Sequence, residues 1–181
     1  MILADEKDKE HGLSDIGRHF LAGMQAHLRE LSLLWAPTIN SYKRYHPGSF
    51  APTAIRWGRD NRTCALRLVG HGSSLRIENR VPGGDVNPYL AVAGMVAAGL
   101  SGIEEKLELE PIFQGNAYAL ETDRVPTSLK EARDLWAQST WVKETFGEDV
   151  QKHYTHMADT ELDAFGRAVT DWERFRSFER M

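Results

Sequence analysis

The densest group of chemically capable side chains lies between Lys43 and Arg80. Eight basic residues against two acidic ones, Asp60 and Glu78, give this stretch a net charge of +6, although the whole chain carries a net charge of −4. Guanidinium groups form paired hydrogen bonds with carboxylate and phosphate oxygens. The cluster therefore indicates an anion site, and the alternative is a solvated face of an antiparallel sheet. Its basic members are Lys43, Arg44, Arg56, Arg59, Arg62, Arg67, Arg76 and Arg80.

One strand-like stretch places a carboxylate among these arginines. Residues 75–81 alternate strictly, so that Arg76, Glu78 and Arg80 share one face, at a spacing of roughly 6 to 7 Å between alternate residues. Arg67 is expected to join this face from the neighbouring strand. Glu78 is then either an ion-pair partner of the arginines or a ligand of a divalent metal whose bound phosphates the arginines hold. A metal would need further ligands from elsewhere.

Hydrophobic periodicity predicts the elements that position these residues. Strands are expected at residues 54–57, 64–69 and 75–81, the first two forming a hairpin. Helices are expected at residues 14–34, 88–103, 128–136 and 150–172, the second of them beneath the sheet. No repeat or linker divides the chain. The expected fold class is α+β, with antiparallel strands packed against helices in one unit.

Composition narrows the class of protein. With 181 residues and 41% hydrophobic residues, the chain can bury one core of ordinary size. An acidic balance argues against a nucleic-acid partner, and the longest apolar run, residues 88–103, is too short to cross a membrane. Cys64 is the one cysteine, so it cannot form an internal disulfide. The charged first ten residues lack the apolar core of a secretion signal, and we expect a cytoplasmic protein.

A series of short motifs carries a family resemblance. In their order and spacing they resemble the C-terminal half of the glutamine synthetase catalytic domain. The motifs are Asn40-Ser41-Tyr42-Lys43-Arg44, Pro47-Gly48, Ala51-Pro52, Asn61-Arg62, Arg67, Arg76-Ile77-Glu78-Asn79-Arg80, Pro82, Asn87-Pro88-Tyr89-Leu90, Leu100-Ser101-Gly102-Ile103 and Trp172-Glu173-Arg174-Phe175.

The resemblance implies an ATP-dependent ligase reaction. Members of this family phosphorylate the side-chain carboxylate of glutamate, and an amine then attacks the acyl phosphate to form an amide. Fixed arginines and Mg²⁺ or Mn²⁺ would stabilise the charge that gathers on the phosphoryl oxygens during transfer. By the same resemblance, Arg44 and Arg80 grip glutamate, Arg62 stabilises the transferring phosphate and contacts nucleotide, Arg67 and Arg76 contact nucleotide phosphates, and Glu78 is a metal ligand.

One position departs from the ammonia-using members of the family. Those members carry an acidic residue just before the Ala-Pro pair, where it helps bind and deprotonate ammonium, and this chain has Phe50 there. An aromatic ring cannot act as a base. The sequence is therefore more similar to the γ-glutamylpolyamine synthetase-like branch, in which the acceptor is a larger organic amine. This implies that Phe50 lines the acceptor pocket, with a polyamine, another organic amine or ammonia as the acceptor.

The resemblance also covers only part of the family's pattern. Residues 1–181 correspond to a partial catalytic domain, without the N-terminal β-grasp domain and without the first half of the catalytic domain, which carries the other metal ligands. We therefore expect this chain to be inactive alone. The alternative is a non-catalytic fragment, or a subunit that assembles with a separate N-terminal half. The resemblance implies that the complete enzyme is a homo-oligomer.

Overall fold

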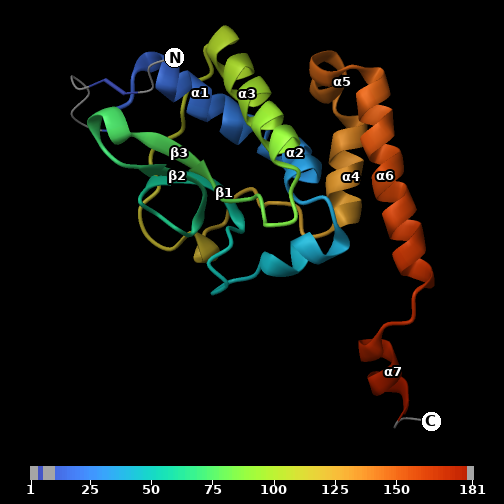
Figure 1. Cartoon of the computed structure of the whole chain (residues 1–181). Coiled ribbons are helices and arrows are strands. Elements are labelled where there is room, and N and C mark those ends of the chain that lie inside the picture. Colours follow the sequence, from blue (N-terminus) through green and yellow to red (C-terminus); the bar gives the residue numbers. More distant parts are fainter. Residues whose placement is uncertain (1–3, 6–10, 179–181) are drawn as a thin grey trace.

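The computed structural model describes residues 4–5 and 11–178 of the chain (Figure 1). A three-stranded sheet lies beside the first three α-helices, and a second group of helices packs at the other end of the molecule. Most of the charged N-terminal segment lies outside the described residues. The α+β fold class expected from the sequence is confirmed.

The first predicted helix consists of two helices, α1 (Asp15–Ala26) and α2 (Leu28–Trp35). Backbone hydrogen bonds run on through the junction, because the His27 amide donates to Gly23 and the His27 carbonyl accepts from Leu31. The His27 ring stacks on Trp141 with a centroid distance of 3.7 Å, and its Nδ1 lies 2.6 Å from Glu30 Oε1. These side-chain contacts coincide with a backbone turned away from helical angles at His27.

The helix expected at residues 88–103 is α3 (Pro88–Glu104), and Asn87 caps it by accepting a hydrogen bond from the Tyr89 amide. It packs along α1, so its predicted place beneath the sheet is wrong. Small residues explain the difference, because they allow the two backbones to approach closely. A Cβ atom on Gly102 would lie 2.1 Å from the His19 carbonyl oxygen, and one on Gly23 would lie 2.1 Å from that of Ala98.

The sheet contains β1 (Ala54–Arg59), β2 (Cys64–Val69) and β3 (Arg76–Asn79) in that order. The predicted hairpin is wrong, because β1 and β2 run parallel, with Ala54 opposite Cys64. The short connection returns the chain to the start of β1 and is fixed by Asn61 Oδ1, which accepts from the amide and hydroxyl of Thr63. β2 and β3 are antiparallel, as expected.

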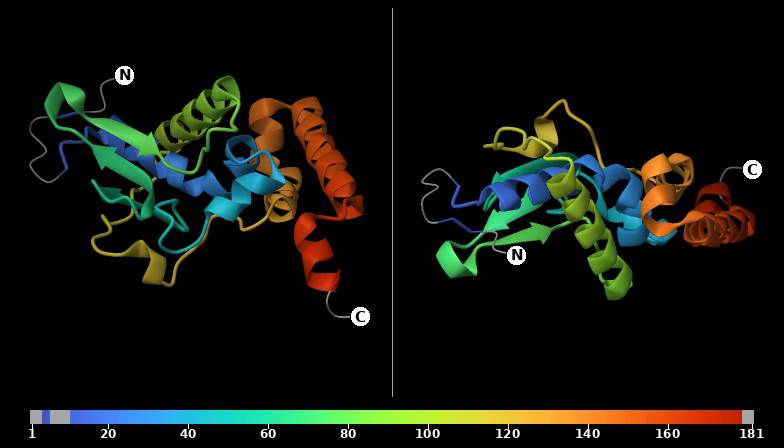
Figure 2. Two further views of the ribbon diagram at one scale, coloured as in Figure 1. Left: turned by 60° about the horizontal axis from the view of Figure 1, so that its bottom comes forward. Right: turned by 90° about the horizontal axis from the view of Figure 1, so that it is seen from above.

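The C-terminal helices differ from the single long helix that the sequence predicts. After α4 (Leu129–Gln138), a short α5 (Thr140–Phe146) precedes α6 (Glu148–Arg167), and α7 (Asp171–Phe178) is separate. Thr170 and Glu173 form a capping box that begins α7 anew. Trp172, which the sequence pattern assigned to a buried stripe, is exposed on α7, and α7 extends away from the body (Figure 2).

Three buried tryptophans join the parts of the core. Trp35, Trp57 and Trp136 are almost fully buried, and each indole N–H donates to a carbonyl oxygen of a distant segment. The acceptors are Ala91 at 3.3 Å, Glu110 at 2.7 Å and Gln151 at 2.9 Å, respectively. Each ring therefore buries a large apolar area without leaving its donor unsatisfied. Short 3₁₀ turns connect the elements at η1 (Ile39–Arg44), η2 (Gly72–Ser74) and η3 (Ala117–Ala119).

The close approach of α1 and α3 can be tested with Gly102→Ala. Alanine favours a helix by about 1 kcal/mol over glycine, but here its Cβ meets the backbone of α1. We expect a net destabilisation of about 1 to 3 kcal/mol in urea unfolding. Gly166→Ala is the control, because nothing lies within 4 Å of a Cβ at that helical glycine. Equal stability of the two variants would contradict the close contact.

Candidate active site

The antiparallel pairing of β2 and β3 places Arg67 directly opposite Glu78. Arg67 Nη1 donates to Glu78 Oε2 at 2.8 Å, and Arg80 Nη1 donates to Glu78 Oε1 at 3.0 Å. Both oxygens of one carboxylate are therefore held by arginines, one on β2 and one directly after β3. Arg67 also donates to Asp60, at the end of β1. The predicted grouping of Glu78 with Arg80 and with Arg67 of β2 is confirmed, whereas Arg76, the third member of the predicted face, donates to the Ser74 carbonyl.

Arg44 reaches the same region from η1. Its Nη1 donates to the Val81 carbonyl at 3.2 Å, its Nη2 lies 3.4 Å from the Arg80 carbonyl, and its guanidinium carbon lies 5.2 Å from the centre of the Tyr45 ring. The Tyr45 hydroxyl donates to the same Val81 oxygen at 2.8 Å. The end of β3 is thereby tied to η1. Two arginines that are far apart in the sequence thus lie at one site.

Phe50 has a left-handed backbone, with φ of 61°, and its side chain is 68% exposed. Few residues other than glycine adopt this conformation. The main chain of Phe50 contacts the site directly, because Arg80 Nη2 donates to the Phe50 carbonyl oxygen at 2.7 Å. The main chain of Phe50 and the guanidinium of Arg80 are therefore coupled, while the Phe50 ring is left free of that contact.

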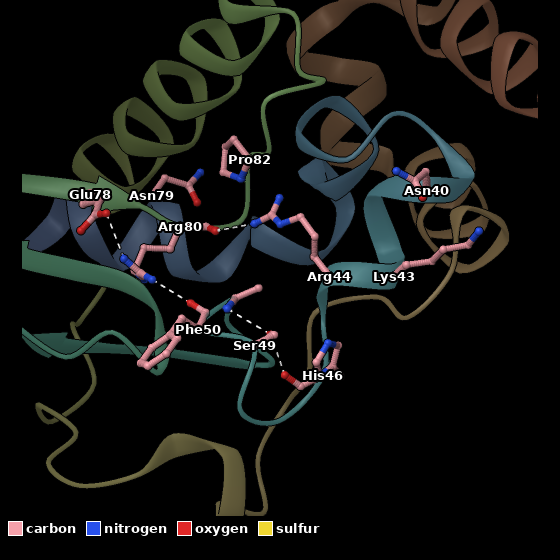
Figure 3. Close-up of a pocket in the computed structure, with 11 residues that line it drawn as sticks. Asn40, Lys43, Arg44, His46, Ser49, Phe50, Glu78, Asn79, Arg80 and Pro82 are labelled. Carbon is pink, nitrogen blue, oxygen red and sulfur yellow. Dashed lines mark hydrogen bonds and ion pairs between the residues drawn. The ribbon is translucent and has the colours of Figure 1, made fainter.

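These groups line one pocket with a volume of about 630 Å³ (Figure 3). Lys43, Arg44 and Arg80 line this pocket against one carboxylate, that of Glu78. A pocket with this charge fits a ligand that brings acceptors, such as a carboxylate. The lining residues are Asn40, Lys43, Arg44, His46, Ser49, Phe50, Ala51, Glu78, Asn79, Arg80 and Pro82.

Three predicted phosphate-side arginines do not line this pocket. Arg67 is one strand away, Arg62 is exposed in the β1–β2 connection, and Arg76 Nη1 donates to the Ser74 carbonyl at 3.2 Å on an exposed part of β3. Sequence reasoning in turn missed Asn79 as a site residue, since its place in the alternation assigned it to the apolar face. The end of β3, where the chain turns toward η1, brings it to the pocket.

Charges around the site shift two pKa values. The hydrogen bond from Arg67 lowers the pKa of the Asp60 carboxyl below its ordinary value of 3.8, and the same bond raises the pKa of Arg67. Elsewhere, burial raises the pKa of the Cys64 thiol to about 11. Cys64 is therefore protonated at neutral pH and is no nucleophile, consistent with a buried position in β2.

The metal site implied by the family resemblance does not fit the residues of this chain alone. Within residues 4–5 and 11–178, no group of three or more His, Cys, Asp or Glu side chains is arranged to hold a metal ion. Both oxygens of Glu78 are occupied by arginines. Divalent ions such as Mg²⁺ require about six oxygen ligands, so this carboxylate could supply only part of a site.

The chain is an α+β domain with a pocket lined by basic side chains at the end of β3. The family model of the glutamine synthetase catalytic domain matches residues 1–177, and the chain belongs to this family. The resemblance expected from the sequence is thus confirmed. Within the described residues, every helix is too short or too polar to cross a membrane.

Similar proteins include enzymes named for organic amines. The chain is 67% identical over 170 residues to the gamma-glutamylethanolamide synthetase GlnA4 of Streptomyces coelicolor, covering 94% of this chain and 37% of that protein. It is 40% identical over 168 residues to a glutamate–isopropylamine ligase of a Pseudomonas species, covering 91% of this chain and 37% of that one.

A solved structure described as the GmaS/ADP complex superposes with a TM-score of 0.84 at 29% identity, covering 98% of this chain and 42% of that one. A second, described as GmaS without ligand, gives a TM-score of 0.85 and covers 41% of its chain. The chain thus spans less than half the length of the relatives that it matches. Its fold is that of the corresponding part of the larger structures.

The pairing of Asp60 with Arg67 predicts a pH effect that Arg67→Gln removes. A lowered folded-state pKa means that the pair stabilises the fold above pH 3.8 and that this contribution is lost as the pH falls through the lowered pKa. In the variant, we expect the pKa of the Asp60 carboxyl to rise toward 3.8. Carboxyl ¹³C NMR over a pH series measures this pKa. Asp134, whose pKa is lowered by a hydrogen bond from Lys130, should not change. An unchanged Asp60 would refute the pairing.

Proposed function

We propose that this chain supplies the glutamate and acceptor side of an ATP-dependent ligase that forms a γ-glutamyl amide from glutamate and an organic amine. The observation that carries the proposal is one pocket that joins Arg44, Arg80 and Phe50. Arg44 and Arg80 would hold the carboxylates of glutamate, and Phe50 would border the incoming amine. The relatives named for ethanolamide and isopropylamine ligation support this assignment.

The chemistry requires charge stabilisation rather than a covalent intermediate on the protein. The γ-carboxylate of glutamate would attack the terminal phosphorus of ATP, with ADP as the leaving group. The neutral amine would then attack the carbonyl carbon of the acyl phosphate, releasing phosphate and a proton as the amide forms. Negative charge gathers on the phosphoryl oxygens, where fixed guanidinium groups stabilise it. We assign this role to Arg62, and contacts with the nucleotide phosphates to Arg62, Arg67 and Arg76. The ADP named in a similar solved structure supports nucleotide use.

Glu78 is the residue of this set that would donate a carboxylate to Mg²⁺ or Mn²⁺. Such an ion supplies Lewis-acid stabilisation of phosphoryl oxygens when bound. Because no group of three or more possible ligand side chains is arranged to hold a metal ion among the described residues, the remaining ligands would come from outside them. We propose that the complete ligase is a cytoplasmic homo-oligomer, as the family resemblance implies.

The charge of the pocket favours a monoamine over a polyamine as the acceptor. Lys43, Arg44 and Arg80 line it against one carboxylate, that of Glu78. A polyamine would bring a second cation into a site that is already positive, at a cost in Coulomb energy. A small amine with a neutral tail avoids this repulsion. Ethanolamine is therefore our first candidate, in agreement with the name of the relative that is 67% identical.

The decisive experiment measures phosphate release that depends on both glutamate and an amine. The chain is assayed alone, and joined to the preceding part of the Streptomyces coelicolor relative, with ethanolamine, isopropylamine, putrescine and ammonia. We expect activity only in the joined protein, with ethanolamine preferred over putrescine. A folded, joined protein that is silent with every amine would refute the proposed function. Activity of the chain alone would refute the expectation that it needs the missing ligands.

The role of Phe50 is tested in the same joined protein with Phe50→Ala. Loss of the ring should lower kcat/KM for the preferred amine about 10-fold or more, the range expected for one apolar pocket contact. The KM for ATP should change little, because the Arg80 contact uses the Phe50 main chain. Lys43→Ala, at the opposite end of the pocket lining, is a comparison variant for general damage to the pocket. An equal loss of kcat/KM with every amine, ammonia included, would show that Phe50 does not border the acceptor.

A further inference from the structure

The proposed amide-forming step releases a proton that needs an acceptor. As the amine nitrogen bonds to the acyl carbon, the nitrogen becomes positively charged, and the amide forms only once this nitrogen has lost a proton. A side chain with a free lone pair near the nitrogen accelerates such a step by general base catalysis. The Phe50 ring, which would border the amine, offers no such lone pair.

The side chains that line the pocket include few groups that can take up a proton. Lysine and arginine side chains carry N–H donors and no acceptor, which excludes Lys43, Arg44 and Arg80. Both oxygens of Glu78 already accept hydrogen bonds from arginines. The amide and hydroxyl side chains of the lining are too weakly basic. Among the described residues that line the pocket, this leaves His46, and imidazole gains and loses a proton near neutral pH.

The hydrogen bond of the His46 ring determines which of its nitrogens is free. Nδ1 lies 3.1 Å from the Pro47 carbonyl oxygen. Because a carbonyl oxygen can only accept, the neutral ring carries its hydrogen on Nδ1 and its lone pair on Nε2. Nε2 has no hydrogen-bond partner among the described residues. The two nitrogens lie on different edges of the ring, so Nε2 stays available to a molecule bound in the pocket that His46 lines.

One hydrogen-bonded loop carries both His46 and Phe50. The His46 carbonyl accepts from the Ser49 amide at 3.2 Å and from the Ser49 hydroxyl at 2.7 Å. The Ser49 hydroxyl oxygen in turn accepts from the Ala51 amide at 3.2 Å. Figure 3 shows His46, Ser49 and Phe50 together on this loop. The imidazole and the ring that would border the amine are therefore held by the same short segment.

On the basis of the proposed function, we propose that His46 Nε2 is the general base of amide formation. As the bond between the amine nitrogen and the acyl carbon forms, a nitrogen–hydrogen bond breaks and its proton passes to Nε2. The bond between the acyl carbon and the phosphate oxygen then breaks, and phosphate leaves with that electron pair. The His46 side chain is exposed, so the imidazolium can return its proton to solvent.

Recognition of the substrate's tail is a competing role for His46. Nε2 would then accept a hydrogen bond from the hydroxyl group of ethanolamine. The two roles make different predictions, because a general base serves every amine and a hydroxyl contact serves only an amine that carries a hydroxyl group. Isopropylamine has no hydroxyl group and therefore distinguishes the two roles.

The test introduces His46→Gln into the joined protein, because glutamine forms hydrogen bonds but takes up no proton near neutral pH. We expect kcat for amide formation to fall about 100-fold or more with ethanolamine and isopropylamine alike. The formation of ADP from ATP and glutamate in a single turnover without amine should be unchanged, because it precedes the proton transfer. His156→Gln, at an exposed position of α6 outside the pocket, is the matched control and should change neither rate.

Two further measurements respond only to a proton acceptor. The decrease of kcat toward acidic pH in the unaltered joined protein should be absent in His46→Gln, which keeps the charged groups that line the same pocket, Lys43, Arg44, Glu78 and Arg80. Free imidazole added to His46→Ala should restore part of the lost rate.

Three results would overturn the role of His46. They are unchanged amide formation in His46→Gln, a loss confined to ethanolamine, and an equal loss of ADP formation without amine. The last of these would indicate that His46 only supports the loop. An unaltered joined protein that forms no amide with any amine would refute the proposed function, and this role with it.

Discussion

The site depends on one carboxylate shared by two arginines. Glu78 sits between Arg67 and Arg80, and this arrangement holds two cations at short range in an otherwise acidic protein. Without the carboxylate, the guanidinium groups would repel each other across the β2–β3 ladder. Arg80 connects this carboxylate to a second segment, because it also donates to the main-chain carbonyl of Phe50. Arg44 donates to the Val81 carbonyl, near the end of β3.

The scaffold that supports this network is rigid for a different reason. α1 and α3 approach through glycines, and three tryptophans tie distant segments to the core through their indole N–H groups. The sheet itself is small, and its β1 edge is closed by a later loop of the same chain. The pocket therefore rests on well-packed elements on one side. On the other side it lies at the end of β3, the strand at the other edge of the sheet.

Sequence patterns over a few residues predict the elements that depend on interactions between neighbouring residues. The strand within residues 75–81 and the Asn87 cap are properties of short segments and are confirmed, but the strand ends at Asn79, and the strict alternation fails there because Asn79 lines the pocket together with Glu78 and Arg80. The prediction that β1 and β2 form an antiparallel hairpin is wrong. A four-residue connection suggests a hairpin, whereas the pairing also depends on distant partners of β1 such as Asp123. The meeting of Arg44 with Arg80 is equally non-local. No periodicity indicates it, and among the sequence signals the family resemblance alone associates these two residues.

The contact between Arg80 and position 50 has a consequence for how such enzymes diversify. Its acceptor is a main-chain carbonyl, a group that every amino acid possesses. A substitution there can alter the side chain that borders the pocket while the arginine keeps its partner, provided that the new residue tolerates the left-handed backbone. Under the proposed function, selectivity for the acceptor and attachment of the arginine would thereby be separated at a single residue. New acceptors would then arise by single mutations without loss of the charged network.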